Sequence, residues 1–216
     1  MTSAITVVQA DEMETEDFYF VERNRFAVSD GFNLSTDSAA KLPLSYVTVS
    51  NACRLVCVAD SHNVYCLKLE KLYTSISMSA NSPTKQSHSS VKRDHVHATF
   101  SPFPNQNGQI LGLHCNCDGT HLAVLVSCNA TGIVLVYDTR LLLKNESSPT
   151  HFAAIPYTNT HVSAFAWNPT NPSIFVVATE TPELNVITLQ DQGVDSFSVT
   201  NVNLANNNDA QPSPTC

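Results

Sequence analysis

Short runs of Val, Ile, Leu, Tyr and Thr, separated by Asn, Asp, Pro and Gly, dominate the chain. Few segments repeat their apolar residues every three or four positions, as an amphipathic helix does. Short apolar runs bounded by turn-forming residues are typical of β-strands. The pattern therefore predicts an all-β protein, whose first strand or bent pair of strands spans residues 18–28.

One arrangement of strand, turn, strand, turn and strand occurs three times, at residues 46–69, 110–138 and 162–189. Recurrence of a three-strand unit is the sequence sign of a β repeat array. Residues 97–100 add one further expected outer strand. The alternative interpretation is a sandwich of unrelated antiparallel hairpins.

The folded region is expected to span residues 17–192, with repeat units near 45–72, 97–142 and 161–190. Three segments lack the apolar anchors that a packed core requires. We expect a disordered acidic N-terminus at 1–16, an exposed Ser-rich insertion at 73–96 and a disordered tail at 193–216.

Composition narrows the possible partners. Of the 216 residues, 43% are hydrophobic and 14% are charged, and the formal net charge is -8. A nucleic-acid binder that neutralises phosphates requires a basic face, and so does a protein that docks on anionic lipid. We therefore expect no direct nucleic-acid partner. Although the charge by itself keeps the protein soluble, an acidic surface also speeds encounter with a basic protein.

Apolar runs in the chain are shorter than the roughly 18 residues of a membrane span. The N-terminus has no basic region followed by an apolar stretch, so it does not resemble a signal peptide. The seven cysteines are odd in number and irregularly spaced, which is a poor disulfide framework. These features predict an intracellular protein with free cysteines and without membrane insertion.

Three groups of residues contain potential metal ligands. His114, Cys115, Cys117 and His121 lie close in sequence, but they lack the usual Cys-x(2–4)-Cys knuckle of a zinc site. We interpret them as core cysteines and turn histidines. The pair Cys53 and Cys57 is a similarly weak candidate, and Asp94, His95 and His97 are expected to be solvated.

Catalytic signatures are missing from the sequence. It has no Gly-x-Ser-x-Gly motif and no phosphate-binding loop, and its paired carboxylates lie in the acidic N-terminus. The sequence therefore predicts a non-enzyme with no catalytic residue, cofactor, resident metal or small-molecule substrate. A thiol- or metal-dependent hydrolase remains a remote alternative.

The second repeat resembles a WD40 blade. Residues 113–124 precede Tyr137-Asp138, which stands where that family has Trp-Asp. The third repeat is similar, because Ala166-Trp167-Asn168-Pro169 opens a tight turn between two inner strands. The resemblance implies a WD40-like β-propeller. Trp167 is a candidate partner-binding residue, but its place beside the turn favours a packing role.

The order of the segments resembles a narrower family, the N-terminal β-propeller of the cytoplasmic-face FG nucleoporin (CAN family). The match runs from residue 17 to residue 189, and its most specific words are Tyr137-Asp138-Thr139-Arg140 and residues 167–173. The resemblance implies a seven-bladed ring at the cytoplasmic face of the nuclear pore. There it would dock a DEAD-box RNA helicase during mRNA export, beside other nucleoporins.

The chain departs from this family in two ways. It has about three blades' worth of strands and no Phe-Gly dipeptide, so contact with transport receptors through FG repeats is excluded for these residues. The family's docking surface lies largely on later blades, so no partner-binding residue is transferred. We expect a non-enzymatic docking platform with part of a seven-bladed ring, or alternatively a generic WD40 adaptor in another complex. Because an open arc leaves strand edges unpaired, we expect its stability to be marginal or partner-dependent.

Overall fold

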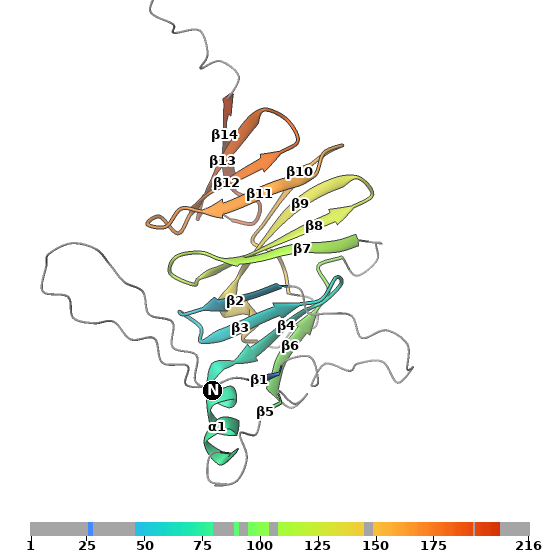
Figure 1. Ribbon diagram of the computed structural model, residues 1–216. Coiled ribbons are helices and arrows are strands. Elements are labelled where there is room, and N and C mark those ends of the chain that lie inside the picture. Colours follow the sequence, from blue (N-terminus) through green and yellow to red (C-terminus); the bar gives the residue numbers. More distant parts are fainter. Residues whose placement is uncertain are drawn as a thin grey trace, which may run out of the picture.

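The structure is a computed structural model, and it describes residues 26–27, 46–79, 89–90, 95–103, 108–144, 149–191 and 193–203. Three four-stranded antiparallel sheets account for most of these residues. Figure 1 shows the sheets stacked in chain order, each twisted relative to the next. Successive four-stranded antiparallel sheets arranged in this way are the blades of a β-propeller. The predicted fold, all-β with about three propeller blades, is confirmed.

Blade 1 consists of β2 (Tyr46–Ser50), β3 (Leu55–Ala59), β4 (Val64–Lys68) and β6 (Val96–Phe100). The helix α1 (Leu69–Ser79) follows β4 directly. Every residue of β3 is buried, and so are the first four of β4. Burial on both faces explains why these strands are continuous apolar runs rather than alternating ones.

Blade 2 consists of β7 (Gly108–Cys115), β8 (His121–Cys128), β9 (Thr131–Asp138) and β10 (Ala153–Tyr157). A single helical turn, α2 (Thr139–Leu142), follows β9. This blade lies between the other two, and both faces of its central strands are buried.

Blade 3 consists of β11 (Val162–Trp167), β12 (Ile174–Thr179), β13 (Glu183–Leu189) and β14 (Phe197–Asn203). Burial alternates along β12, where every second residue is fully buried and the others are partly exposed. One face of blade 3 therefore packs on blade 2 and the other is open.

The outer strands correct the expected repeat boundaries. β6 pairs with β4 and so completes blade 1, although residues 97–100 were expected to begin the second unit, 97–142. β10 lies in none of the three expected units and completes blade 2. β14 lies within 193–216, which was expected to be a disordered tail, yet it pairs with β13 along its whole length. Outer strands bury few side chains, so their sequences carry little apolar signal.

The Ser-rich segment 73–96 also differs from expectation. Its first residues continue α1 as far as Ser79, and β5 (Ser89–Ser90) pairs in parallel with β1 (Phe26–Ala27). The opening segment 18–28 was expected to form a strand or a bent pair of strands, and its described part, β1, pairs with the insertion rather than with a blade. The acidic segment 1–16 lies outside the described residues, as does 204–216.

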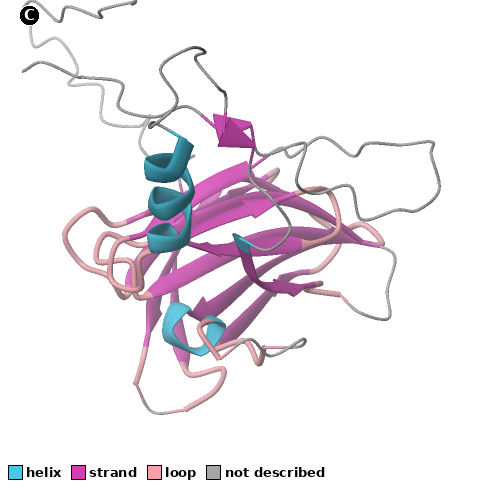
Figure 2. Ribbon diagram, turned by 90° about the horizontal axis from the view of Figure 1, so that it is seen from below, coloured by secondary structure: helices cyan, strands magenta, loops and turns pink. Residues whose placement is uncertain are grey.

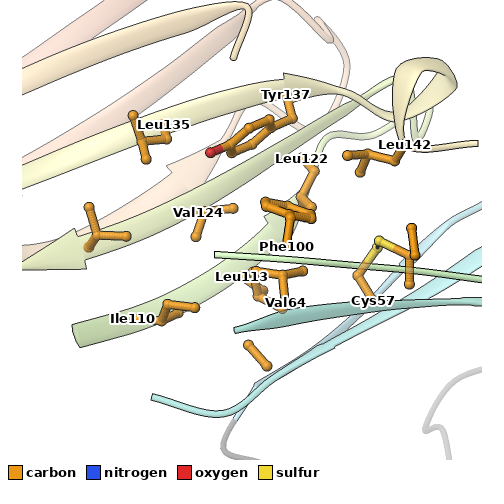
Figure 3. Close-up of a cluster of buried hydrophobic side chains, with 14 of the residues drawn as sticks. Cys57, Val64, Phe100, Ile110, Leu113, Leu122, Val124, Leu135, Tyr137 and Leu142 are labelled. Atoms are coloured by element: carbon orange, nitrogen blue, oxygen red, sulfur yellow. Dashed lines mark hydrogen bonds between the residues drawn. The ribbon is translucent and has the colours of Figure 1, made fainter. Parts of the chain in front are cut away.

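Three apolar clusters fill the fold, because neighbouring side chains of a strand point to opposite faces. The first lies between blades 1 and 2, and Figure 3 shows side chains of both blades directed into it, among them Val64, Phe100, Leu122 and Tyr137. The second lies between blades 2 and 3 and is centred on Phe175 and Val177. The third lies on the outer face of blade 1, where Leu72 of α1 covers the two central strands.

The six cysteines among the described residues are free. No helix within these ranges has both the length and the apolar character needed to cross a bilayer.

Candidate protein-docking face

The turns that join the first two strands of each blade lie at the same end of the sheets, because the blades have the same strand order and direction. These turns are residues 51–54, 116–120 and 168–173. The helices α1 and α2 follow the third strands of blades 1 and 2 and so leave from the same end, and Figure 2 shows both on one side of the strands. We call this surface the turn face.

Hydrogen bonds join the turn of blade 1 to that of blade 2. The Ser50 hydroxyl donates to the Gly119 carbonyl oxygen (2.5 Å), and Thr139 Oγ1 donates to the same oxygen (2.8 Å). Gly119 has a φ of 78°, and a Cβ there would lie 2.6 Å from the backbone nitrogen of Asn51. Glycine is required at this close approach, because a side chain would displace the neighbouring turn.

The turn of blade 2 is joined to blade 3 in a similar way. Asn116 Nδ2 donates to the Pro172 carbonyl oxygen (3.0 Å), while Asn116 Oδ1 accepts from the His121 backbone N–H (3.0 Å). Trp167 Nε1 donates to the His114 carbonyl oxygen (2.9 Å). The three turns thus form one hydrogen-bonded series across the turn face.

The two short sequence motifs behind the family resemblance, residues 137–140 and 167–173, both form turns. In the first, Asp138 caps α2 by accepting from the Arg140 backbone N–H, and its carboxylate also pairs with the Arg140 guanidinium (2.7 Å). That hydrogen-bonded pair lowers the pKa of Asp138. In the second, Asn168 Oδ1 accepts from the backbone N–H groups of Thr170 and Asn171. Asparagine and aspartate side chains stabilise turns in this manner.

A cavity of about 290 Å³ opens on the turn face between the first turn and α1. Tyr73 is 57% exposed beside it, and Arg54 forms an exposed pair with Glu70 at 3.4 Å. Tyrosine and arginine are enriched among residues that dominate protein–protein binding. This cavity was not predicted from the sequence, because α1 was not expected and the two walls are 15 or more residues apart. It is lined by Ser50, Asn51, Arg54, Leu69, Glu70 and Tyr73.

The residues considered as zinc ligands are dispersed around the turn of blade 2. Cys117 is exposed in the turn, while Cys115 ends β7 and its N–H donates to Thr48 Oγ1 (3.1 Å). The ring of His114 stacks on Phe165 with centroids 5.1 Å apart, and His121 lies against Trp167 and Phe152. Burial lowers the pKa of both histidines. Within the described ranges, no group of three or more His, Cys, Asp or Glu side chains is placed to hold a metal ion.

The other two sets of potential metal ligands include residues that contact neighbouring strands or backbone atoms. Cys57 lies opposite Cys66 on the neighbouring strand, with sulfur atoms 3.8 Å apart, and Cys53 contacts Thr139 Oγ1. His97 was expected to be solvated, but it lies in β6 and its Nε2 is 2.7 Å from the Leu143 carbonyl oxygen. Asp94 lies outside the described residues.

Trp167 is a packing residue, as its position beside the turn predicted. Its ring contacts Phe165 and Phe175 edge to face, with centroids 5.7 and 4.9 Å apart. Together with the hydrogen bond to His114, these contacts place it between blades 2 and 3. It belongs to the inter-blade core rather than to a free surface.

Comparison with known proteins gives similarity of fold alone. No protein-family model matches the chain, and no curated protein matches it. Solved structures similar to it include Hsv2p of Kluyveromyces lactis (12% identity, TM-score 0.47, 77% of this chain and 49% of that one). Another is Sqt1 of Saccharomyces cerevisiae, with 9% identity and a TM-score of 0.47 over 74% of this chain and 35% of that one. A third is the periplasmic gluconolactonase PpgL of Pseudomonas aeruginosa, with 14% identity and a TM-score of 0.48 over 76% of this chain and 40% of that one. The chain therefore spans less than half the length of each.

Proposed function

We propose that this protein is a non-enzymatic docking platform of the nuclear pore, and that its turn face binds a DEAD-box RNA helicase in mRNA export. The observation that supports a docking role is the series of hydrogen bonds through Ser50, Gly119, Asn116 and Pro172, which holds three turns in fixed relation. A surface whose loops are already ordered loses little conformational entropy when a partner binds.

The nature of the partner follows from the resemblance to the cytoplasmic-face nucleoporin. The motifs that carry this resemblance lie on the turn face, at Tyr137-Asp138-Thr139-Arg140 and Trp167–Ser173. The net charge of -8 favours encounter with a basic partner and disfavours direct binding of RNA. On the same resemblance, we propose that the protein lies at the cytoplasmic side of the nuclear envelope, beside other nucleoporins.

Because the family's docking surface lies largely on later blades, the contact point cannot be taken from the resemblance, and we propose it from this chain alone as the cavity beside α1. Its lining includes the exposed Tyr73 and Arg54, and the Arg54 guanidinium pairs with Glu70. An aromatic ring and a guanidinium in a concave site provide both apolar contact and directed hydrogen bonds.

The test is binding of the purified 216-residue chain to a purified mRNA-export DEAD-box helicase, measured by calorimetry, with an unrelated DEAD-box helicase as comparison. We expect binding to the first protein alone, and at least a tenfold loss of affinity for Tyr73→Ala, which corresponds to about 1.4 kcal/mol. Glu180→Ala is the control and leaves affinity unchanged, because Glu180 is an exposed residue in the β12–β13 turn, at the opposite end of the sheets. Equal affinity for both helicases, or for neither, contradicts the proposal.

Localisation provides a second test. The tagged chain is expected at the nuclear rim, and its immunoprecipitate is expected to contain pore proteins. Recovery of a different stable complex, with neither pore proteins nor a helicase, would favour the generic WD40 adaptor.

A further inference from the structure

Two cysteines of blade 1 face each other across neighbouring strands. Strand register places Cys57 of β3 directly opposite Cys66 of β4, and their sulfur atoms are 3.8 Å apart. Both residues are fully buried in the apolar cluster between blades 1 and 2, where Figure 3 shows the Cys57 side chain. The two thiols are therefore enclosed by the core, and neither of them lines the cavity of the turn face.

Hydrogen bonds at the two ends of this hairpin show which kind of cross-strand pair the cysteines form. The Asp60 N–H donates to the Asn63 carbonyl oxygen at one end (3.2 Å), and the Leu69 N–H donates to the Arg54 carbonyl oxygen at the other (2.9 Å). Hydrogen-bonded and non-hydrogen-bonded pairs alternate along an antiparallel ladder. Counting inward from either end gives the same result, which is that the cysteines form a non-hydrogen-bonded pair.

This kind of pair has the spacing that a disulfide needs. The Cα atoms of a non-hydrogen-bonded pair are about 4.5 Å apart, at the lower end of the roughly 4.4–6.8 Å that disulfides span. The sulfur atoms must approach from 3.8 Å to the bonded distance of about 2.0 Å. Because the backbone spacing already fits, rotation of the side chains is sufficient and the strands keep their register. A spacing at the end of the range favours a bond that is readily reduced again.

We propose that Cys57 and Cys66 form a reversible redox switch, which hydrogen peroxide converts to a disulfide between β3 and β4. The sulfur of one cysteine attacks a peroxide oxygen, so that the O–O bond breaks, a sulfenic acid forms and the departing oxygen takes up the thiol proton as water. The sulfur of the other cysteine then attacks the sulfenic sulfur, forming the S–S bond and releasing a second water. The two cysteines together lose two electrons, which the peroxide gains.

Burial makes this switch slow. The hydrogen bond with Cys66, and then burial, raise the pKa of Cys57, so that little of the reactive thiolate is present at neutral pH. The pair is therefore expected to oxidise more slowly than the exposed Cys117 and to respond to prolonged rather than brief oxidation.

The disulfide is expected to act on the stability of blade 1. It closes a short loop around the β3–β4 turn, residues 57–66, and so restricts the unfolded chain. The same two strands lead to the walls of the cavity, because β3 follows Arg54 and β4 precedes Leu69. Oxidation therefore holds together the hairpin that carries the cavity, and reduction releases it.

The experiment treats the reduced, purified 216-residue chain with hydrogen peroxide, removes the peroxide with catalase and alkylates the remaining thiols after unfolding. Trypsin cuts after Arg54 and Lys68, so both cysteines lie on one peptide. We expect this peptide to lack alkyl groups, to be lighter than the reduced peptide by two hydrogen atoms, and to revert with dithiothreitol. The urea midpoint of the oxidised chain is expected to rise by roughly 1 M and to fall back after reduction.

Cys57→Ala and Cys66→Ala are each expected to abolish the rise in the urea midpoint. Cys128→Ala is the matched control, because Cys128 is also a buried strand cysteine but lies in blade 2, and it is expected to keep both the linked peptide and the rise. The proposal is overturned if peroxide leaves both cysteines of the tryptic peptide open to alkylation, or if either of them is linked to a different cysteine. A linked peptide without a rise in the midpoint, or a rise that persists in both alanine variants, also overturns it.

Discussion

The indole Nε1 of Trp167 donates a hydrogen bond of 2.9 Å to the carbonyl oxygen of His114, fifty-three residues earlier in the chain. One side chain thus ties the first strand of blade 3 to the first strand of blade 2. The bond lies beside the Phe165–His114 ring stack, so polar and apolar contacts hold the same junction. The contribution of the hydrogen bond to the free energy of unfolding can be measured separately from that of the ring contacts.

Replacement of Trp167 by Phe tests the hydrogen bond while keeping an aromatic ring. We expect the free energy of unfolding to fall by about 1 to 2 kcal/mol, since the bond is lost and the smaller ring leaves space. Urea unfolding followed by circular dichroism measures the change. Tyr73→Phe, which removes a polar atom from an exposed ring, is the control, and an equal effect of the two changes would refute the explanation.

Gly119 provides a test of the contact between the first two turns. Gly119→Ala introduces a Cβ 2.6 Å from the Asn51 nitrogen at a φ of 78°. We expect a loss of about 2 to 4 kcal/mol, from backbone strain and the displaced turn together. Gly193→Ala is the matched control, because Gly193 also has a positive φ, of 133°, but nothing lies within 4 Å of the added Cβ. If both variants lose the same amount, the turn contact contributes nothing.

The stability of the fold is expected to fall in mildly acidic solution. Burial lowers the pKa of His114 and His121 below the ordinary 6.5. The unfolded chain therefore binds more protons than the folded one just below pH 6.5, and the free energy of unfolding decreases as the pH falls through that range. Urea midpoints at about pH 7.5 and about pH 5.5 measure the effect.

His114→Phe identifies the source of this dependence. It retains a ring to stack on Phe165 and removes the titrating group, so the fall in stability between the two pH values becomes smaller. His161→Gln, at an exposed position, is the control and keeps the wild-type dependence. A His114→Phe protein with the full wild-type dependence would contradict the assignment.

Cysteine reactivity is expected to differ sharply within one turn. Burial raises the pKa of Cys115 to about 12, whereas Cys117, two residues later, is exposed. The hydrogen bond with Cys66, and then burial, raise the pKa of Cys57. Because the thiolate is the reactive form, iodoacetamide should modify Cys117 at least about tenfold faster than Cys115 or Cys57. Peptide mass spectrometry gives the rates, and denatured protein, in which the three should react alike, is the control.

The inner strands could be predicted from sequence because they are buried on both faces. Val56 to Ala59 and Leu122 to Val126 have no polar alternation, and only a covered strand tolerates such a run. The turn motifs could be predicted equally well, since the side chains of Asn168 and Asp138 accept hydrogen bonds from backbone N–H groups a few positions later. Local chemistry and continuous burial are both visible along a chain.

The outer strands and the docking face could not be predicted in the same way. β14 reads Phe-Ser-Val-Thr-Asn-Val-Asn, and six of its seven residues are exposed, so its pairing with β13 is its main stabilisation. The segment that forms α1 does carry apolar residues at helical spacing, Leu69, Leu72, Tyr73 and Ile76, but the many serines that follow made it resemble a loop. The bonds Ser50–Gly119 and Asn116–Pro172 join residues 69 and 56 positions apart, and nothing local encodes such distances.

The helix over blade 1 makes the two ends of the stack of blades different. Leu72 packs over the two central strands of blade 1, whereas Val176 and Val186 on the far face of blade 3 are partly exposed. During synthesis, the end covered by α1 leaves the ribosome first, so blade 1 has its own cover before blade 2 exists, and each later blade has a finished template on which to fold. Blade 1 therefore has a cover from its own chain from the start, whereas blade 3, the last of the described blades to be synthesised, carries a partly exposed apolar face.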